Sequence, residues 1–225
     1  MNMKKVSKWT VMGLLIIPFL LTGCLSKTIN VRYDAAKGNP VRFKVDRKIT
    51  VPVFPFADLR GDEPTRIGGI KGPTKEVYTK IYMPEKAAIF FARALADEME
   101  RMEFVIIDYF DAPVLPEGVT VLREAKVLRK EYPSLDIAVY GQLTKMEINS
   151  LYGIRAELEV KIFMVDIAKE KLAWSGTVTS QIVDPSLTQG TLTSMMSKKL
   201  SEAMNNGIKD FLRSEEFRMT ISPFL

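Results

Sequence analysis

The chain has 225 residues, of which 47% are hydrophobic and 26% charged, a composition typical of a globular protein. Histidine is absent, which excludes an imidazole general base and removes the commonest metal ligand. The single cysteine excludes an internal disulfide and a thiolate-rich metal site. The composition therefore argues against metal sites built from histidine or from several cysteines.

The formal charge of +5 overstates how basic the folded part of the chain is. Three of the 32 basic residues are lysines within the first 23 residues, which contain no acid. The remainder therefore has 29 basic and 27 acidic side chains. A nucleic-acid binder needs a basic patch or stripe, whereas charges of both signs are interspersed here. We predict no nucleic-acid partner.

The first 23 residues have the parts of a secretory signal peptide. Met1–Thr10 is short and basic, Val11–Leu21 is apolar, and small residues precede Cys24. The apolar run is shorter than the ~20 residues that a membrane-spanning helix needs. Leu21-Thr22-Gly23-Cys24 resembles a bacterial lipobox, in which the cysteine is lipidated and becomes the new N-terminus. The alternative is a plain signal peptide followed by an unrelated cysteine.

Lipidation of Cys24 predicts a protein anchored in a membrane of the bacterial cell envelope. Leu25 follows the cysteine, whereas an aspartate there signals inner-membrane retention in sorting of the enteric type. In an organism that has an outer membrane, we therefore expect the protein to be anchored there and to face the periplasm. Residues 24–40 are polar and lack periodicity, so we expect a lipidated N-terminus and tether, followed by a single domain over residues 41–225.

The first half of that domain is expected to contain short strands and a long loop. Val41–Val45 alternates like a short edge strand, and Lys48–Phe56 is β-branched with two prolines, which favours a strand with free ends or a free edge. Ala57–Met83 has three glycine-containing turn signals and no clear periodicity, which predicts a loop. Pro84 is then expected to open an amphipathic helix.

The second half has clearer patterns. Phe104–Ile107 predicts a short buried strand and Val121–Tyr132 a second helix. Three antiparallel strands follow, and in Ile154–Met164 apolar residues alternate with charged ones, which predicts one wet face. A stripe over Leu192–Phe211 predicts a long helix on the dry face. The order β-α-β-α-β-β-β-α predicts an α+β two-layer domain, a mostly antiparallel sheet with helices on one face.

Three segments carry a family resemblance: VPVFPFADLRGD (51–62), DIAVYGQLTKM (136–146) and AELEVKIFMVDIAKEKLAWSGTVTSQ (156–181). With the helices between them, they resemble the periplasmic lipoproteins that share the fold of the TolB N-terminal domain, including CsgG-type and LpoB-type proteins. Within this group the sequence is most similar to the YajG type, which has a PF-x-D-x-R segment and a downstream R-I-G segment. The resemblance implies a lipid-anchored accessory domain without enzymatic activity or cofactor.

The predicted loop is the candidate partner-binding segment, because long polar loops often carry function. Its candidate residues are Asp58, Arg60, Arg66, Lys71, Tyr78 and Tyr82. On this hypothesis Arg60→Glu or Arg66→Glu leaves the fold intact and removes a partner. The alternative is that Asp58 caps the loop backbone and an arginine closes an ion pair. The glycines at 68, 69 and 72 do not match the spacing of a phosphate-binding loop, so we predict no nucleotide.

Paired carboxylates are the remaining catalytic motif. Glu157 and Glu159 lie on one strand face, but Arg155 and Lys161 flank them and keep both ionised. A solvated or docking face is therefore expected rather than an acid pair of a glycosidase. We predict a non-enzymatic lipoprotein that binds an envelope protein or itself. The alternatives are a binder of peptidoglycan, lipid or glycan, and a subunit of an envelope assembly.

Overall fold

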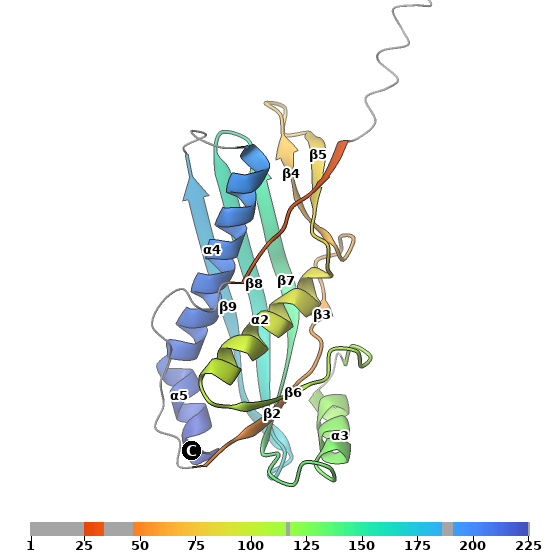
Figure 1. The fold of residues 1–225 in the computed structure, drawn as a ribbon, viewed down its shortest axis with the longest axis vertical. Helices are drawn as coiled ribbons and strands as arrows, with labels where there is room; N and C mark the ends of the chain where they lie inside the picture. Colours follow the sequence, from red (N-terminus) through yellow and green to blue (C-terminus); the bar gives the residue numbers. More distant parts are fainter. Residues whose placement is uncertain (1–24, 34–46, 116–117, 186–190, 225) are drawn as a thin grey trace, which may run out of the picture.

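The computed structural model describes residues 25–33, 47–115, 118–185 and 191–224. Its strands and helices follow one another as β1 (Leu25–Thr28), β2 (Thr50–Val53), β3 (Ala57–Asp58), β4 (Arg66–Lys71), β5 (Val77–Tyr82), α2 (Ala87–Arg101), β6 (Val105–Asp108), α3 (Gly118–Leu128), β7 (Ile137–Ser150), β8 (Ile154–Asp166), β9 (Lys171–Asp184), α4 (Leu192–Arg213), α5 (Glu215–Ile221) and the short 3-10 helix η2 (Ser222–Phe224). The predicted α+β class is confirmed, and Figure 1 shows its curled sheet.

Strand β7 is the centre of the nine-stranded sheet. Along one side it pairs antiparallel with β8, which pairs antiparallel with β9. Along its other side it pairs in succession with β2, β3 and β4, all parallel to it. The sheet continues outward through β5 to β1 at one end and through β2 to β6 at the other. The sheet is therefore mixed, although its longest pairings are antiparallel, as predicted.

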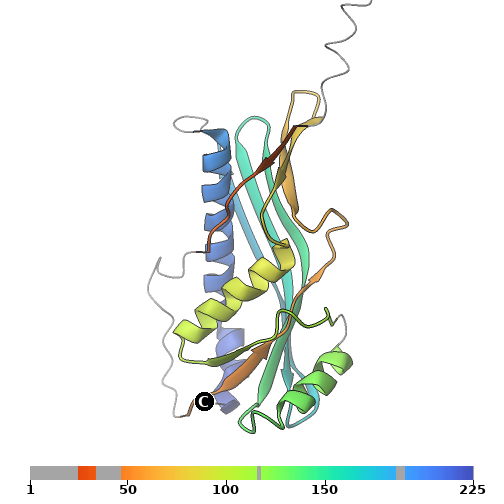
Figure 2. The same cartoon turned by 45° about the vertical axis from the view of Figure 1, so that its right-hand side comes forward.

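The alternation predicted in β8 is confirmed. Leu158, Val160 and Ile162 are buried on the dry face, while Glu159 and Lys161 are exposed on the wet face. Helices α2 and α4 cover the dry face (Figures 1 and 2). Gly207 lets α4 approach closely, because a Cβ there would lie only 3.0 Å from Leu158 Cδ2. Glycine lowers the helix propensity at this position, but its missing side chain allows α4 to pack closer to the sheet.

Helix α3 departs from the expectation that the helices share one face. It packs on the opposite face, at the end of the sheet where β7 begins, over a second apolar cluster. Tyr140 and Phe163 stack there with ring centroids 4.7 Å apart, and Phe54 contacts Tyr109 edge-on. In this part of β7 both faces are buried, so residues 137–141 form a continuous buried run instead of an alternating one.

The segment 57–83 is mostly strand, so the prediction of a long loop is wrong. It contains β3 and the β4–β5 hairpin. Gly68 and Gly69 lie inside β4, and β7 leaves no room for a side chain at Gly68, because a Cβ there would lie 1.9 Å from the Ile148 carbonyl oxygen. Gly68 also has a φ of +140°, which glycine adopts readily. These glycines indicated a turn by composition, but the structure uses them for close strand packing.

The expected tether is partly wrong as well. Leu25–Thr28 forms β1, which pairs in parallel with β5, and Ile29 and Val31 after it are buried. The domain therefore begins at residue 25 rather than 41. Two boundaries also shift: α2 begins at Ala87, after Pro84, and β6 is a partly exposed edge strand rather than a buried one. The predicted strand Val41–Val45 lies outside the described residues.

A pair of aspartate substitutions tests the two faces of the sheet. Leu158→Asp places an unpaired charge under α4, which should cost several kcal/mol and unfold the domain. Thr177→Asp introduces the same residue on the wet face, opposite Lys161, and should change the free energy of unfolding by less than about 1 kcal/mol. Thermal or urea melts of both variants decide, and equal losses would contradict the assigned faces.

Candidate interaction surfaces

The predicted site residues fall into two groups at opposite ends of the β4–β5 hairpin. Asp58, Arg60, Arg66 and Tyr82 lie together where β4 begins, since Arg66 and Tyr82 are register partners. Lys71 and Tyr78 lie at the other end, beside the turn that joins β4 to β5. The structure therefore does not assemble the six residues into one site.

Arg60 is a structural clamp. Its side chain is only 5% exposed, and Nε and Nη2 form a two-point pair with the Asp58 carboxylate, at 2.8 and 2.6 Å. The remaining donors bond carbonyl oxygens of the neighbouring chain: Nη1 those of Arg66 at 2.7 Å and Met146 at 3.4 Å, and Nη2 that of Pro64 at 2.8 Å. All five N–H groups of the guanidinium are thus engaged. This arrangement joins β3, the β3–β4 connection, β4 and β7.

The other members of the set lie nearer the surface. Arg66 pairs with Asp62 at 2.8 Å, and the Tyr82 hydroxyl donates to Glu63 at 3.4 Å. Lys71 Nζ lies 3.8 Å from Glu147, and the exposed Tyr78 ring lies over Gly72. These partly exposed ion pairs contribute about 1 kcal/mol or less each. Of the six candidates, Tyr78 presents the largest free surface.

The wet face carries a ladder of opposite charges on β7 and β8. Glu157 accepts from Arg155 at 2.7 Å and pairs with Lys145 at 2.9 Å. Burial alone would raise the pKa of Glu157, but the hydrogen bonds from Lys145 and Arg155 outweigh it and hold the pKa below its usual range. A general acid needs the opposite shift at neutral pH. The expectation that this carboxylate stays ionised is therefore consistent with its surroundings.

A hollow of about 490 Å³ opens beside the β7–β8 turn. It is lined by apolar residues of that turn and of the end of β9, and by charged residues of β4, β7 and β8. Lys71 is the one predicted site residue that lines it. The adjoining ring of Tyr152 is highly exposed. Apolar and charged side chains thus line the hollow together, and its two carboxylates, Glu147 and Glu157, are already paired.

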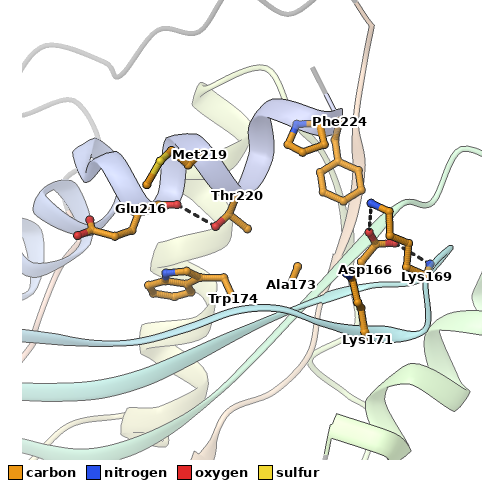
Figure 3. Close-up of a pocket in the computed structure, with 10 residues that line it drawn as sticks. Asp166, Lys169, Lys171, Ala173, Trp174, Glu216, Met219, Thr220 and Phe224 are labelled. Carbon is orange, nitrogen blue, oxygen red and sulfur yellow. Dashed lines mark hydrogen bonds and ion pairs between the residues drawn. The ribbon is translucent and has the colours of Figure 1, made fainter.

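A second hollow, of about 380 Å³, lies at the opposite end of the sheet between β9 and α5 (Figure 3). Two of its charged groups form an ion pair: Lys169 Nζ lies 2.9 Å from the buried Asp166 carboxylate. Burial would raise the pKa of Asp166, but the bonds from Lys169 outweigh it and lower the pKa. Phe224 closes one side and is itself buried. This hollow is formed by the docked C-terminal segment, and its ion pair is structural.

Strand β9 forms an open edge of the sheet. It pairs with β8 along one side, and no strand in the described part of the chain pairs with its other side. The twelve residues Leu172–Val183 contain neither a charged residue nor proline, in a chain that is 26% charged. Edge strands usually carry lysine, proline or a bulge that prevents pairing with other chains. From Trp174 onward β9 pairs with β8 without a bulge, so most of this edge is unprotected.

Sequence reasoning missed two features. The first is the β9 edge, whose signal was the long charge-free run. The second is Glu98 of α2, an acidic residue that is fully buried. It accepts from the Tyr33 hydroxyl at 2.7 Å and from Arg101 at 3.1 Å. Burial, followed by this bond to Glu98, raises the pKa of Tyr33. No sequence signal pointed to a partner so far away along the chain.

The described residues hold no group of three or more acidic side chains, histidines or cysteines placed to bind a metal ion. Within the same residues, no helix combines the length and the apolar character that a membrane span requires.

No family model matches the sequence, and no curated protein matches it. A Xanthomonas campestris protein described by the family model DUF330 has a similar structure, with a TM-score of 0.53 and 12% identity over 89% of this chain and 99% of that one. An uncharacterized protein gives 0.50 and 8% identity over 85% and 98%. Lipoprotein GNA1162 of Neisseria meningitidis gives only 0.37, with 12% identity over 70% and 99%. At these identities the likeness shows the fold alone.

The clamp makes Arg60 a residue of stability, in contrast to the expectation that Arg60→Glu leaves the fold intact. Arg60→Ala leaves the Asp58 carboxylate without its partner and should lower the free energy of unfolding by about 3 kcal/mol or more. Lys80→Ala removes a cation from a half-exposed pair with Glu63 and should cost less than about 1 kcal/mol. Urea melts of the two variants give the comparison. A loss at Arg60 as small as that at Lys80 would contradict the structural role.

Proposed function

We propose that the protein is a lipoprotein of the bacterial envelope, anchored through lipid on Cys24, that acts without catalysis as an adaptor for a protein partner. The observation that carries the adaptor role is the β9 edge. Its outward backbone N–H and C=O groups are complementary to an extended peptide strand, and no charge in Leu172–Val183 opposes pairing. The resemblance to YajG-type lipoproteins supports the same role.

The lipid anchor follows from the lipobox and agrees with the fold. Because β1 begins at Leu25, the residue after the cysteine, cleavage before Cys24 leaves the described domain whole. Residues 1–23 then serve only export. The absence of an aspartate at position 25 supports the outer membrane, with the domain in the periplasm.

The main alternative is a binder of an envelope ligand such as peptidoglycan, lipid or glycan. That function favours an enclosed pocket between the sheet and the last helix. This space is instead filled by buried side chains, among them Leu158, Met196, Leu200 and Met204. A hollow of about 1120 Å³ lies on the outer side of α4, against residues 30–33, and its lining is largely polar and charged. The packing therefore favours the adaptor.

The anchor has a direct test. Cys24→Ser removes the only thiol, so the variant should be an unprocessed or soluble exported protein that takes up no alkyne fatty acid. Wild-type protein processed in the same cells is the control. Continued labelling and flotation of the Cys24→Ser protein would sink the lipidation claim.

The edge is tested by placing two lysines on it. A photoreactive residue at Thr177 should cross-link a partner in intact cells, and Ser175→Lys with Thr179→Lys should abolish the product, because charged side chains oppose strand addition. Val119→Lys with Val127→Lys adds the same charge on exposed positions of α3 and should leave the product unchanged.

Melting curves of both double variants establish that each is folded. A cross-link that persists in the edge variant would refute pairing along β9. A product made only of two copies of this chain would assign the edge to self-association and refute a separate partner.

A further inference from the structure

The chain enters the domain at the same end as several of its turns. β1 begins there, and the β4–β5 turn, the β7–β8 turn and the end of β9 lie beside it, as both views show. We call this the anchor-side end, made of Leu25, residues 72–76, residues 151–153 and residues 183–185. The long strands β7, β8 and β9 run from it along the long axis of the molecule to the opposite end.

The first strand is firmly held. Leu25–Thr28 pairs with Thr79–Tyr82, Ile29 donates to the Tyr82 carbonyl at 2.8 Å, and the side chains of Ile29 and Val31 are buried. Tyr33 then reaches the buried Glu98 of α2. Neighbouring Cα atoms lie 3.8 Å apart. Lipid on Cys24 would therefore sit within one residue of a strand fixed in the sheet.

The side chains of this end suit a membrane interface. Leu25, Tyr78, Tyr152 and Val183 are 68%, 55%, 77% and 63% exposed. Tyrosine is enriched where one end of the ring meets lipid and the other meets water. Three acids nearby are paired: Glu147 with Lys71, Glu157 with Arg155 and Lys145, and Asp184 with Lys199. The β4–β5 turn adds one exposed cation and one exposed acid, Lys75 and Glu76.

We propose that the anchor-side end rests in the headgroup layer of the membrane that holds the lipid, with Tyr152, Tyr78 and Leu25 inserted and the long axis of the domain pointing away. The proposal rests on lipidation of Cys24. Because no tether separates lipid from domain, the orientation is fixed by β1. The hollow beside the β7–β8 turn then faces the headgroups, and the β9 edge runs outward from the bilayer, where a partner reaches it.

Tryptophan reporters in the full-length lipidated protein test this orientation. Trp174 is the only tryptophan after residue 24, so Trp174→Phe gives a silent background. Tyr152→Trp places a reporter at the anchor-side end, and Tyr132→Trp places one just after α3, at the opposite end. In vesicles with brominated acyl chains, the Tyr152→Trp emission should fall roughly two-fold, as for a ring at the headgroup boundary, and the Tyr132→Trp emission should stay unchanged.

Each outcome has one meaning. Flotation of the vesicles reports the anchor separately, so protein that does not float with the vesicles would contradict the lipid anchor and with it the proposed function. Protein that floats with equal quenching at both positions overturns this inference alone. If the Tyr152→Trp ring is shielded from iodide in native membranes but not in pure lipid, a protein covers this end and the inference is wrong. Should the Trp174→Phe protein fail to fold, Trp174 is kept and subtracted as a constant signal.

Discussion

Burial of the alternating apolar side chains of β8 is the interaction on which the rest of the structure depends. Leu158, Val160 and Ile162 lie under α4, while the strand is hydrogen-bonded to β7 on one side and β9 on the other. A shift of one residue would expose this entire set and bury the charged one, so the register is strongly fixed. The fixed register sets the place of β7, which in turn receives β2, β3 and β4 along its other side. The positions of the β9 edge and of the anchor-side end both follow from this arrangement of strands around β7.

What the sequence predicted well is what local periodicity encodes. The alternation of Ile154–Met164 and the stripe over Leu192–Phe211 each repeat over many residues, and both appear as β8 and α4. The α+β class followed from these elements and their order. A strand or helix that buries one face has apolar residues at the period of that element, so the sequence itself shows which face is buried.

The failures share a different cause. Gly68 and Gly69 were placed in a loop by composition, yet their role is set by the backbone of Ile148, some eighty residues away. Leu25–Thr28 lacks a pattern because β1 is exposed along all four residues and owes its place to hydrogen bonds with β5. An ion pair of Arg60 was one of the two expectations, and it forms with Asp58. The carbonyl oxygen of Met146 on β7 that also accepts from Arg60 had no signal in the sequence. The contacts with Ile148, β5 and Met146 join residues that lie far apart along the chain, so only the folded chain reveals them.

On the proposed function, the protein is a non-catalytic domain held at one end by lipid, and its open β9 edge accepts a strand from a partner. Hydrogen exchange of the β9 amides tests that claim most directly. The lipidated protein is compared in native membranes and in vesicles of pure lipid. Partner pairing predicts that alternate amides of Leu172–Val183, those that face away from β8, exchange more slowly in native membranes. Identical exchange along β9 in both settings, with slowing elsewhere on the surface, would contradict the account.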